Sequence, residues 1–176
     1  MKMIRLQGVW HHYGVRPILK DVSFDVDRGE LVAVMGPNGM GKSTLLGLLG
    51  GVLCPLRGSI EVAGKLRRSS PDAELAIRRK LVYLPDDPYL PFLQTGREYI
   101  LAMGRIYGVE EFRLMEHADR LLKLFDLSQQ GDSPIRTYST GQKKKIGLCA
   151  ALITEAEVMV LDEPFSGGLD SSALVA

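Results

Sequence analysis

The sequence predicts an α/β fold with three parts: a P-loop-type core built on a parallel sheet, an antiparallel β subdomain at the N-terminus and an inserted α-helical subdomain. Two observations predict it. Polar and apolar residues alternate in the first part of the chain, most clearly at Val22, Phe24 and Val26, whereas apolar residues recur at helical spacing from Thr95 to Gln130. An apolar, strand-like run then returns at Val158. The helices therefore interrupt an α/β core.

The N-terminal half is expected to contain both strands and helices. Strands are expected where alternating or apolar runs end at turn residues, and they cover residues 3–14, 18–30, 31–35, 58–64 and 81–85. The run Leu31–Met35 is continuously apolar, which is typical of a strand buried in a parallel sheet. Helices are expected at 42–53, where leucines lie three and four apart, and at 69–80, which begins with serine, proline and acidic residues.

The C-terminal half is mainly helical. Helices are expected at 97–108, 110–127 and 138–153, followed by an apolar strand that ends in two acids at 157–164. We expect one domain over 1–176, in which residues 1–91 and 151–176 form the α/β core. Residues 92–150 would form the helical subdomain.

Composition and charge are those of an ordinary globular domain. The 176 residues carry a net charge of +1, so no global basic field attracts nucleic acid, and no nucleic-acid partner is expected. Cys54 and Cys149 form no C-x-x-C pair, and we expect both to be buried free thiols in a reducing compartment. The longest uncharged stretch, residues 43–56, is shorter than the about 20 residues of a membrane helix. A cytoplasmic location is therefore expected.

A glycine-rich loop provides the first chemical motif, because Gly36–Ser43 fits the spacing G-x-x-x-x-G-K-[ST]. Glycines let such a loop curl so that its N–H groups point at a phosphate, and the following helix adds its positive N-terminal end. Lys42 supplies a charge for the outer phosphates of ATP, and the Ser43 hydroxyl is able to bind Mg²⁺. The expected ATP-binding residues of this phosphate loop are Gly36, Pro37, Asn38, Gly39, Met40, Gly41, Lys42, Ser43 and Thr44.

Two acids follow the apolar run at Val158–Leu161. Asp162 lies where a buried strand is expected to emerge, and from there its carboxylate could bind Mg²⁺ directly or through water. Glu163 comes next and could act as the general base for an attacking water. Two acids after apolar residues also occur by chance, but together with a phosphate loop they indicate a nucleotide hydrolase.

A second small-residue turn, Ser139–Gly141, opens the helix expected at 138–153. It forms a second helix start able to bind an anion, although the phosphate loop already holds the phosphates of one ATP. The pair of sites suggests a phosphate held between two molecules.

Together these motifs resemble the nucleotide-binding domain of ATP-binding cassette (ABC) ATPases, and most closely the bacterial export-type (ABC-2-like) subunits. The likeness covers almost the whole chain. The matching features, in chain order, are Tyr13 at the adenine-stacking position, the phosphate loop, "YLPDDP" at the Q-loop, "YSTGQ" at the signature, "VMVLDEP", and "SGGLD" at the D-loop.

The resemblance implies a head-to-tail dimer with a second ABC ATPase subunit, identical or different. The residues of one subunit that would contact the ATP of the other are Ser139, Thr140, Gly141, Gln142 and Asp170. The resemblance further implies an ATPase with Lys42 and Glu163 as catalytic residues, and with Ser43 and Asp162 holding Mg²⁺.

Such a subunit would drive a transmembrane permease, and an exporter is the favoured direction. It would lie in the cytoplasm on the inner face of the cell membrane, docked on the permease through its helical insert. Two alternatives stay open: a soluble ABC protein acting on ribosomes or DNA, and a degenerate cassette that regulates a partner without hydrolysing ATP.

The Q-loop departs from the family pattern, because Asp86 stands where the family usually has glutamine. Its carboxylate could bind Mg²⁺ and tune ATP affinity, or it could cap a turn with Asp87 and Pro88. The basic run Lys143–Lys145 is expected to be a solvated helix face.

The signature and the C-terminus also depart from the pattern. Tyr138 and Thr140 replace the leucine and the first glycine of the family signature. The sequence stops at Ala176, before the strand that carries the family's γ-phosphate histidine, so we expect it to be truncated at its C-terminus.

Overall fold

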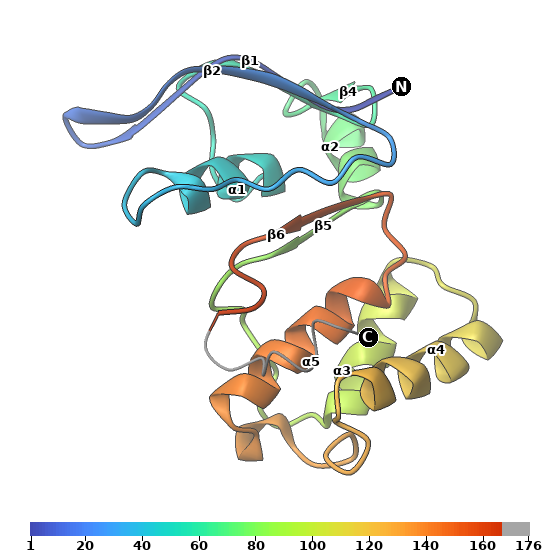
Figure 1. The fold of residues 1–176 in the computed structure, drawn as a ribbon. Coiled ribbons are helices and arrows are strands. Elements are labelled where there is room, and N and C mark those ends of the chain that lie inside the picture. The colour runs from blue at the N-terminus through green and yellow to red at the C-terminus, as the bar shows by residue number, and fades with distance from the viewer. Residues whose placement is uncertain (167–176) are drawn as a thin grey trace. The chain divides into compact units, whose positions relative to one another are not determined.

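The computed structural model describes residues 1–166 and separates the chain into two compact units, Met1–Tyr83 and Leu84–Ala176 (Figure 1). The elements that begin in the first unit are β1 (Lys2–Tyr13), β2 (Arg16–Asp27), α1 (Lys42–Gly50), β3 (Arg57–Val62), β4 (Lys65–Leu66), α2 (Pro71–Arg78) and β5 (Leu81–Leu84). Those of the second unit are α3 (Gly96–Ile106), α4 (Glu111–Leu124), the 3₁₀ turn η1 (Ile135–Thr137), α5 (Thr140–Leu152) and β6 (Val158–Leu161).

The first unit is built on an antiparallel sheet with the strand order β2-β1-β3-β4. Leu6 of β1 lies opposite Phe24 on one side and Ile60 on the other, and its side chain is buried. A register shift follows Leu6, where Gly8 has a φ of 57°. A Cβ at Gly58 of β3 would lie 2.3 Å from the carbonyl oxygen of Gly8, so only glycine allows these two backbones to approach so closely.

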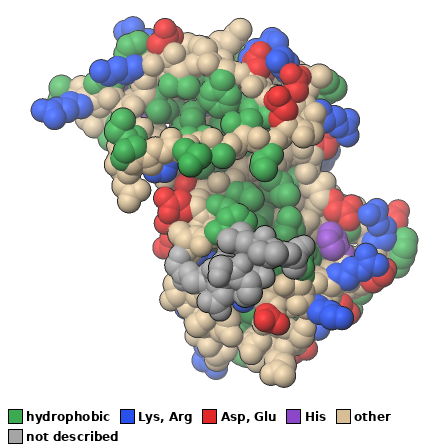
Figure 2. Space-filling model, in the orientation of Figure 1, with side chains coloured by type: hydrophobic (Ala, Val, Ile, Leu, Met, Phe, Trp, Pro, Cys, Tyr) green, Lys and Arg blue, Asp and Glu red, His purple; other side chains and the backbone are tan. Residues whose placement is uncertain are grey.

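The strand expected at Leu31–Met35 is wrong. Residues 30–37 have no regular secondary structure, and Leu31 and Met35 are 99% and 88% exposed. A parallel strand needs a hydrogen-bonded neighbour and cover on both faces. Within residues 1–166 no strand pairs with this segment, so its apolar composition is not sufficient to make it a buried strand. Figure 2 shows further exposed hydrophobic side chains on one face of the first unit.

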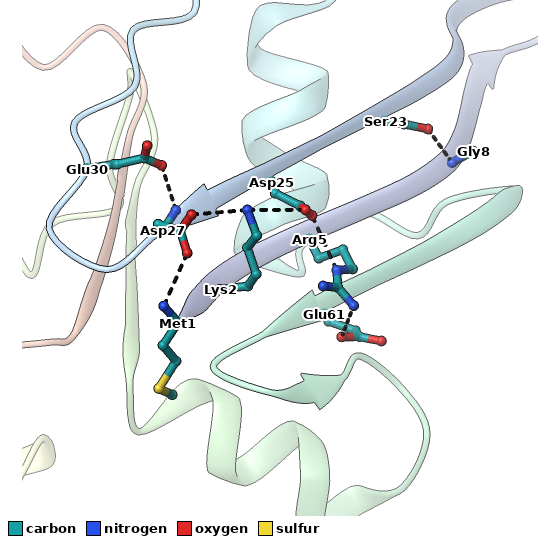
Figure 3. Close-up of polar contacts among 9 residues, drawn as sticks. All are labelled: Met1, Lys2, Arg5, Gly8, Ser23, Asp25, Asp27, Glu30 and Glu61. Carbon is teal, nitrogen blue, oxygen red and sulfur yellow. Dashed lines mark hydrogen bonds and ion pairs between the residues drawn. The ribbon is translucent and has the colours of Figure 1, made fainter.

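Polar contacts hold the end of β2, from which the chain leads to the phosphate loop (Figure 3). Lys2 Nζ lies 3.0 Å from Asp27 Oδ2 and 3.4 Å from Asp25 Oδ2, and the N–H of Asp27 donates to Glu30 Oε2 at 2.6 Å. The hydrogen bond from Lys2 holds the pKa of Asp27 below its usual value. These side chains are exposed, so the contacts orient the strand end more than they stabilise the fold.

The second unit contains helices α3, α4 and α5, which contact one another (Figure 1). α3 begins with a capping box: Thr95 Oγ1 accepts the N–H of Glu98, and Glu98 Oε2 accepts the N–H of Thr95. A Cβ at Gly104 of α3 would lie 2.2 Å from Leu114 of α4, so glycine allows the two helices to pack closely. β6 pairs with β5, whose last residue, Leu84, belongs to this unit.

The large side chains at the centre of the second unit are almost fully buried, and they are Ile100, Leu114, Leu122, Leu127, Ile135, Ile146 and Ile153. Four of them, Ile100, Leu114, Leu122 and Ile146, lie in α3, α4 and α5, so these helices turn apolar residues toward the core. The α/β fold class, with an antiparallel β subdomain and inserted helices, is therefore confirmed.

Candidate functional site

The phosphate loop, Gly36–Thr44, lies in the first unit, and its glycines adopt conformations that other residues rarely adopt. The φ angles are 153° at Gly36, 81° at Gly39 and 90° at Gly41. In the part of the chain that is described, a Cβ at Gly36 or Gly39 would meet no atom within 4 Å. Backbone conformation, not packing, therefore calls for glycine at these two positions. At Gly41 packing also requires glycine, because a Cβ there would lie 2.6 Å from Ile18 Cγ2.

Lys42 bends back over this loop. Its Nζ donates to the carbonyl oxygen of Gly36 at 2.9 Å and to that of Pro37 at 3.1 Å. The ammonium group is thus held beside the loop by two neutral acceptors. Because a charged phosphate oxygen is a stronger hydrogen-bond partner than a carbonyl, Lys42 is placed to bind an anion.

Helix α1 begins at Lys42, within the phosphate loop, and its N-terminus is uncapped. Its N-cap, Gly41, makes no side-chain hydrogen bond to the first turn, so the first N–H groups of the helix lack the acceptor that a serine or aspartate would provide. Ser43 is exposed and Thr44 is buried. Free N–H groups at the positive end of a helix form an anion-binding site, so the loop and the helix start fit a phosphate group.

Asp162 lies at the end of β6 in the second unit. It is 4% exposed, and its N–H donates to the carbonyl oxygen of Leu84 at 2.9 Å. The hydroxyl of Ser43 and the carboxylate of Asp162 are the hard oxygen donors that Mg²⁺ prefers. Residues 1–166 contain no cluster of three or more acidic, histidine or cysteine side chains that could hold a metal. Mg²⁺ bound by one or two such protein oxygens usually takes its other ligands from water and substrate phosphates.

Glu163 follows Asp162 and has a strained backbone. Its side chain is exposed, and its φ of 44° lies in the left-handed region, which costs a residue with a Cβ about 1–2 kcal/mol. Its carbonyl oxygen accepts the N–H of Ser166 at 3.0 Å. Strained residues of this kind are often found at functional sites, and the role of Glu163 as a base stays a prediction.

The signature residues form the start of α5. Ser139 is the N-cap: its Oγ accepts the N–H of Gln142 at 3.2 Å, and Gln142 Oε1 accepts the N–H of Ser139 at 2.8 Å. Ser139 and Thr140 are exposed, while Gly141 and Gln142 are half-buried. Tyr138 is buried, and its hydroxyl donates to the carbonyl oxygen of Gln130 at 2.6 Å. The tyrosine that departs from the family signature is thus part of the core of the helical unit.

Asp86 pairs with two residues that the sequence did not single out for function. Lys144 Nζ lies 2.5 Å from Asp86 Oδ1, and Ser166 Oγ lies 2.9 Å from the same oxygen. The expectation that Lys143–Lys145 is simply a solvated face is therefore wrong for Lys144, whose side chain is 18% exposed. The partners lie 58 and 80 residues from Asp86, so no local sequence pattern could have revealed them. The hydrogen bond from Lys144 holds the pKa of Asp86 below its usual value.

Tyr13 lies at the end of β1, is 57% exposed and has its ring edge-on to His11, with 4.9 Å between ring centroids. A side chain this exposed fits the expected stacking on adenine, which stays a prediction. Asp170 lies outside the described residues. Cys149 is buried, but Cys54 is exposed, so the expectation that both thiols are buried is wrong for Cys54.

The family described as "ABC transporter" matches residues 19–166. The chain belongs to the ABC transporter family. The solved structure of an ATP-binding subunit of an ABC transporter matches this ABC chain with a TM-score of 0.87 and a sequence identity of 32%. That match covers 98% of this chain and 70% of the other.

Two relatives are ATP-binding proteins with different named roles. The daunorubicin resistance ATP-binding protein DrrA3 of Streptomyces coeruleorubidus is 36% identical over 166 residues, which cover 93% of this chain and 51% of that protein. The taurine import ATP-binding protein TauB of Escherichia coli O157:H7 is 32% identical over 169 residues, which cover 96% and 63%. This ABC chain therefore spans between about half and two thirds of the length of these relatives.

The family assignment confirms the resemblance seen in the sequence. The chain is an ABC transporter ATP-binding domain, and ATP-binding domains of this family bind and hydrolyse ATP. Among the described residues, no helix has the length and apolar character needed to cross a membrane.

Proposed function

We propose that this chain is an ATP-hydrolysing subunit that powers a membrane transporter, and that it does so as a dimer docked on a transmembrane permease. The observation that carries the proposal is the phosphate loop: three glycines in glycine-favouring conformations, a lysine folded over them and an uncapped helix start. Each of these features offers hydrogen-bond donors or positive charge to a phosphate chain.

The proposed roles of the residues follow from their chemistry. Lys42 and the loop N–H groups bind the phosphates, Tyr13 stacks on adenine, and Ser43 and Asp162 hold Mg²⁺. When bound, Mg²⁺ neutralises part of the charge on the phosphates. Glu163, exposed at the turn after β6, accepts the proton of the attacking water.

The signature is proposed to act on the ATP bound to a second subunit. Ser139, Thr140, Gly141 and Gln142 lie at the exposed or half-buried start of α5, and Asp170 would join them. The helix start gives this surface the partial positive charge that a γ-phosphate attracts.

The direction of transport is proposed to be export, because the Q-loop region with an acid at Asp86 resembles export-type subunits. Similarity by itself does not select a direction, since one relative is named for taurine import. A soluble protein acting on ribosomes or DNA is less favoured, because the net charge of +1 gives the chain no overall positive field to attract a nucleic acid.

The proposal is tested by ATP binding to native protein, Lys42→Ala and the control Lys65→Ala, whose side chain is an exposed lysine of the same unit. A charge-assisted hydrogen bond contributes about 1.5–3 kcal/mol, so Lys42→Ala should weaken binding by about 10- to 150-fold. Titration with a fluorescent ATP analogue measures this change. Equal affinities of native protein and Lys42→Ala would reject the assignment of the phosphate loop.

A further inference from the structure

Three segments of the second unit meet at one cluster of side chains, Asp86, Lys144 and Ser166. Asp86 lies in the loop after β5, Lys144 in the second turn of α5, and Ser166 in the turn after β6. Lys144 Nζ lies 2.5 Å from Asp86 Oδ1 and 2.5 Å from Ser166 Oγ. One ammonium group therefore joins the loop, the helix and the turn.

Ser166 extends this cluster to Glu163. Its Oγ lies 2.9 Å from Asp86 Oδ1 and 3.0 Å from the carbonyl oxygen of Glu163, so its single hydroxyl hydrogen has an acceptor on either side. Its N–H also donates to that carbonyl at 3.0 Å. The strained backbone of Glu163, with a φ of 44°, is thus held from one side by Ser166, which is in turn held by Lys144.

Lys144 differs from the lysines beside it in its partner: Lys143, Lys144 and Lys145 are all half-buried, and Lys144 is the one that pairs with Asp86. Its side chain is 18% exposed, whereas the carboxylate side chain of Asp86 is 52% exposed. An anionic partner favours the ammonium group of a half-buried lysine, and Asp86 provides one. The same contact accounts for the acid at the Q-loop position, because the negative charge of Asp86 is balanced by Lys144 within the second unit.

We propose that Lys144 is a positioning residue for ATP hydrolysis, which holds Glu163 in place through Ser166 and neutralises Asp86. This inference rests on the proposed function. The main role of Asp86 is then to hold Lys144 in place. The position of Glu163 depends in turn on Lys144, which lies in α5, the helix that begins with the signature. The helix start at Ser139 and the turn at Glu163 are thereby connected by three side chains.

The test uses Lys144→Met, which keeps the length of the side chain and removes its charge, together with Lys144→Arg and the control Lys145→Met on the same helix. Lys144→Met should lower kcat for ATP at least tenfold while KM changes less than about twofold. Lys144→Arg should restore most of the rate, because arginine can donate to both Asp86 and Ser166. Lys145→Met should behave like native protein.

A measurement without nucleotide completes the test. Hydrogen exchange at the Ser166 amide should accelerate in Lys144→Met and stay at the native rate in Lys145→Met, because the first variant loosens the turn that holds Glu163. An unchanged exchange rate at Ser166, or an unchanged kcat in Lys144→Met, overturns the inference even when native protein hydrolyses ATP. Failure of the proposed function looks different: native protein and Lys42→Ala would then bind ATP equally.

Discussion

Alanine substitutions at three glycines separate ATP binding from folding in this chain. Gly39 in the phosphate loop and Gly64 between β3 and β4 have nearly the same φ, 81° and 74°, and a Cβ at either would meet no atom of the described residues within 4 Å. An alanine held in the left-handed region costs about 1–2 kcal/mol. Gly39→Ala and Gly64→Ala should therefore lose equal amounts of stability.

Gly41→Ala should lose more. Its φ is 90°, and its Cβ would lie 2.6 Å from Ile18 Cγ2 and 3.1 Å from Leu19 Cδ2. Overpacking of this kind costs about 1–3 kcal/mol, which together with the backbone term gives about 2–5 kcal/mol. Urea unfolding, followed by the fluorescence of Trp10, the single tryptophan and a residue of β1, measures the free energy of unfolding of the first unit.

ATP affinity provides the second readout of the series. Loss of one charge-assisted hydrogen bond from the loop corresponds to about 10- to 150-fold weaker binding. Gly39→Ala should show this loss, whereas Gly64→Ala should bind like native protein. If Gly39→Ala and Gly64→Ala bound ATP equally well, the claim that the glycine backbone of the phosphate loop binds phosphate would be refuted. Equal stability of Gly41→Ala and Gly64→Ala would refute the packing argument.

Three further predictions concern single side chains. Tyr13→Ala should weaken ATP binding by about 5- to 150-fold, since base stacking contributes about 1–3 kcal/mol, while the affinity for inorganic triphosphate stays unchanged; equal effects on both ligands would contradict adenine stacking. A maleimide should label Cys54 and spare Cys149 in the folded protein, because burial raises the pKa of Cys149 to about 12; mass spectrometry of the labelled protein checks this. The Lys2 hydrogen bond lowers the pKa of Asp27 below its ordinary 3.8, so Asp27→Asn should lower the unfolding midpoint at neutral pH. That difference should vanish as the pH falls through the lowered pKa, and a difference that persists in acid would contradict the pairing.

Local signals in the sequence predicted most elements of the fold. Ser70 and Pro71 start α2 as their helix-start chemistry suggested, and Ser139 caps α5. Apolar residues at helical spacing predicted α3 and α4 because helix periodicity depends only on near neighbours. The phosphate loop was equally predictable, because the spacing of its glycines and lysine is read from one continuous stretch of sequence.

Features that depend on distant residues were not predictable in this way. Leu31–Met35 has the composition of a buried strand, but a strand also requires a partner, which composition does not specify. The pairing of Asp86 with Lys144 joins residues far apart in the chain, so Lys144 looked like one of three solvated lysines. Cys54 was expected inside because cysteine is usually buried, yet it is exposed. The ATP-contacting roles of the site residues stay predictions.

The central claim, that this chain hydrolyses ATP, is tested most directly by phosphate release from native protein, Glu163→Gln and the control Glu110→Gln. Glu110 is an exposed glutamate at the start of α4 that makes no side-chain cap. We predict that Glu163→Gln binds ATP with native affinity, releases almost no phosphate and accumulates as an ATP-bound dimer, while Glu110→Gln turns over at the native rate. Normal phosphate release by Glu163→Gln would contradict the account, because another group would then have to act as the base.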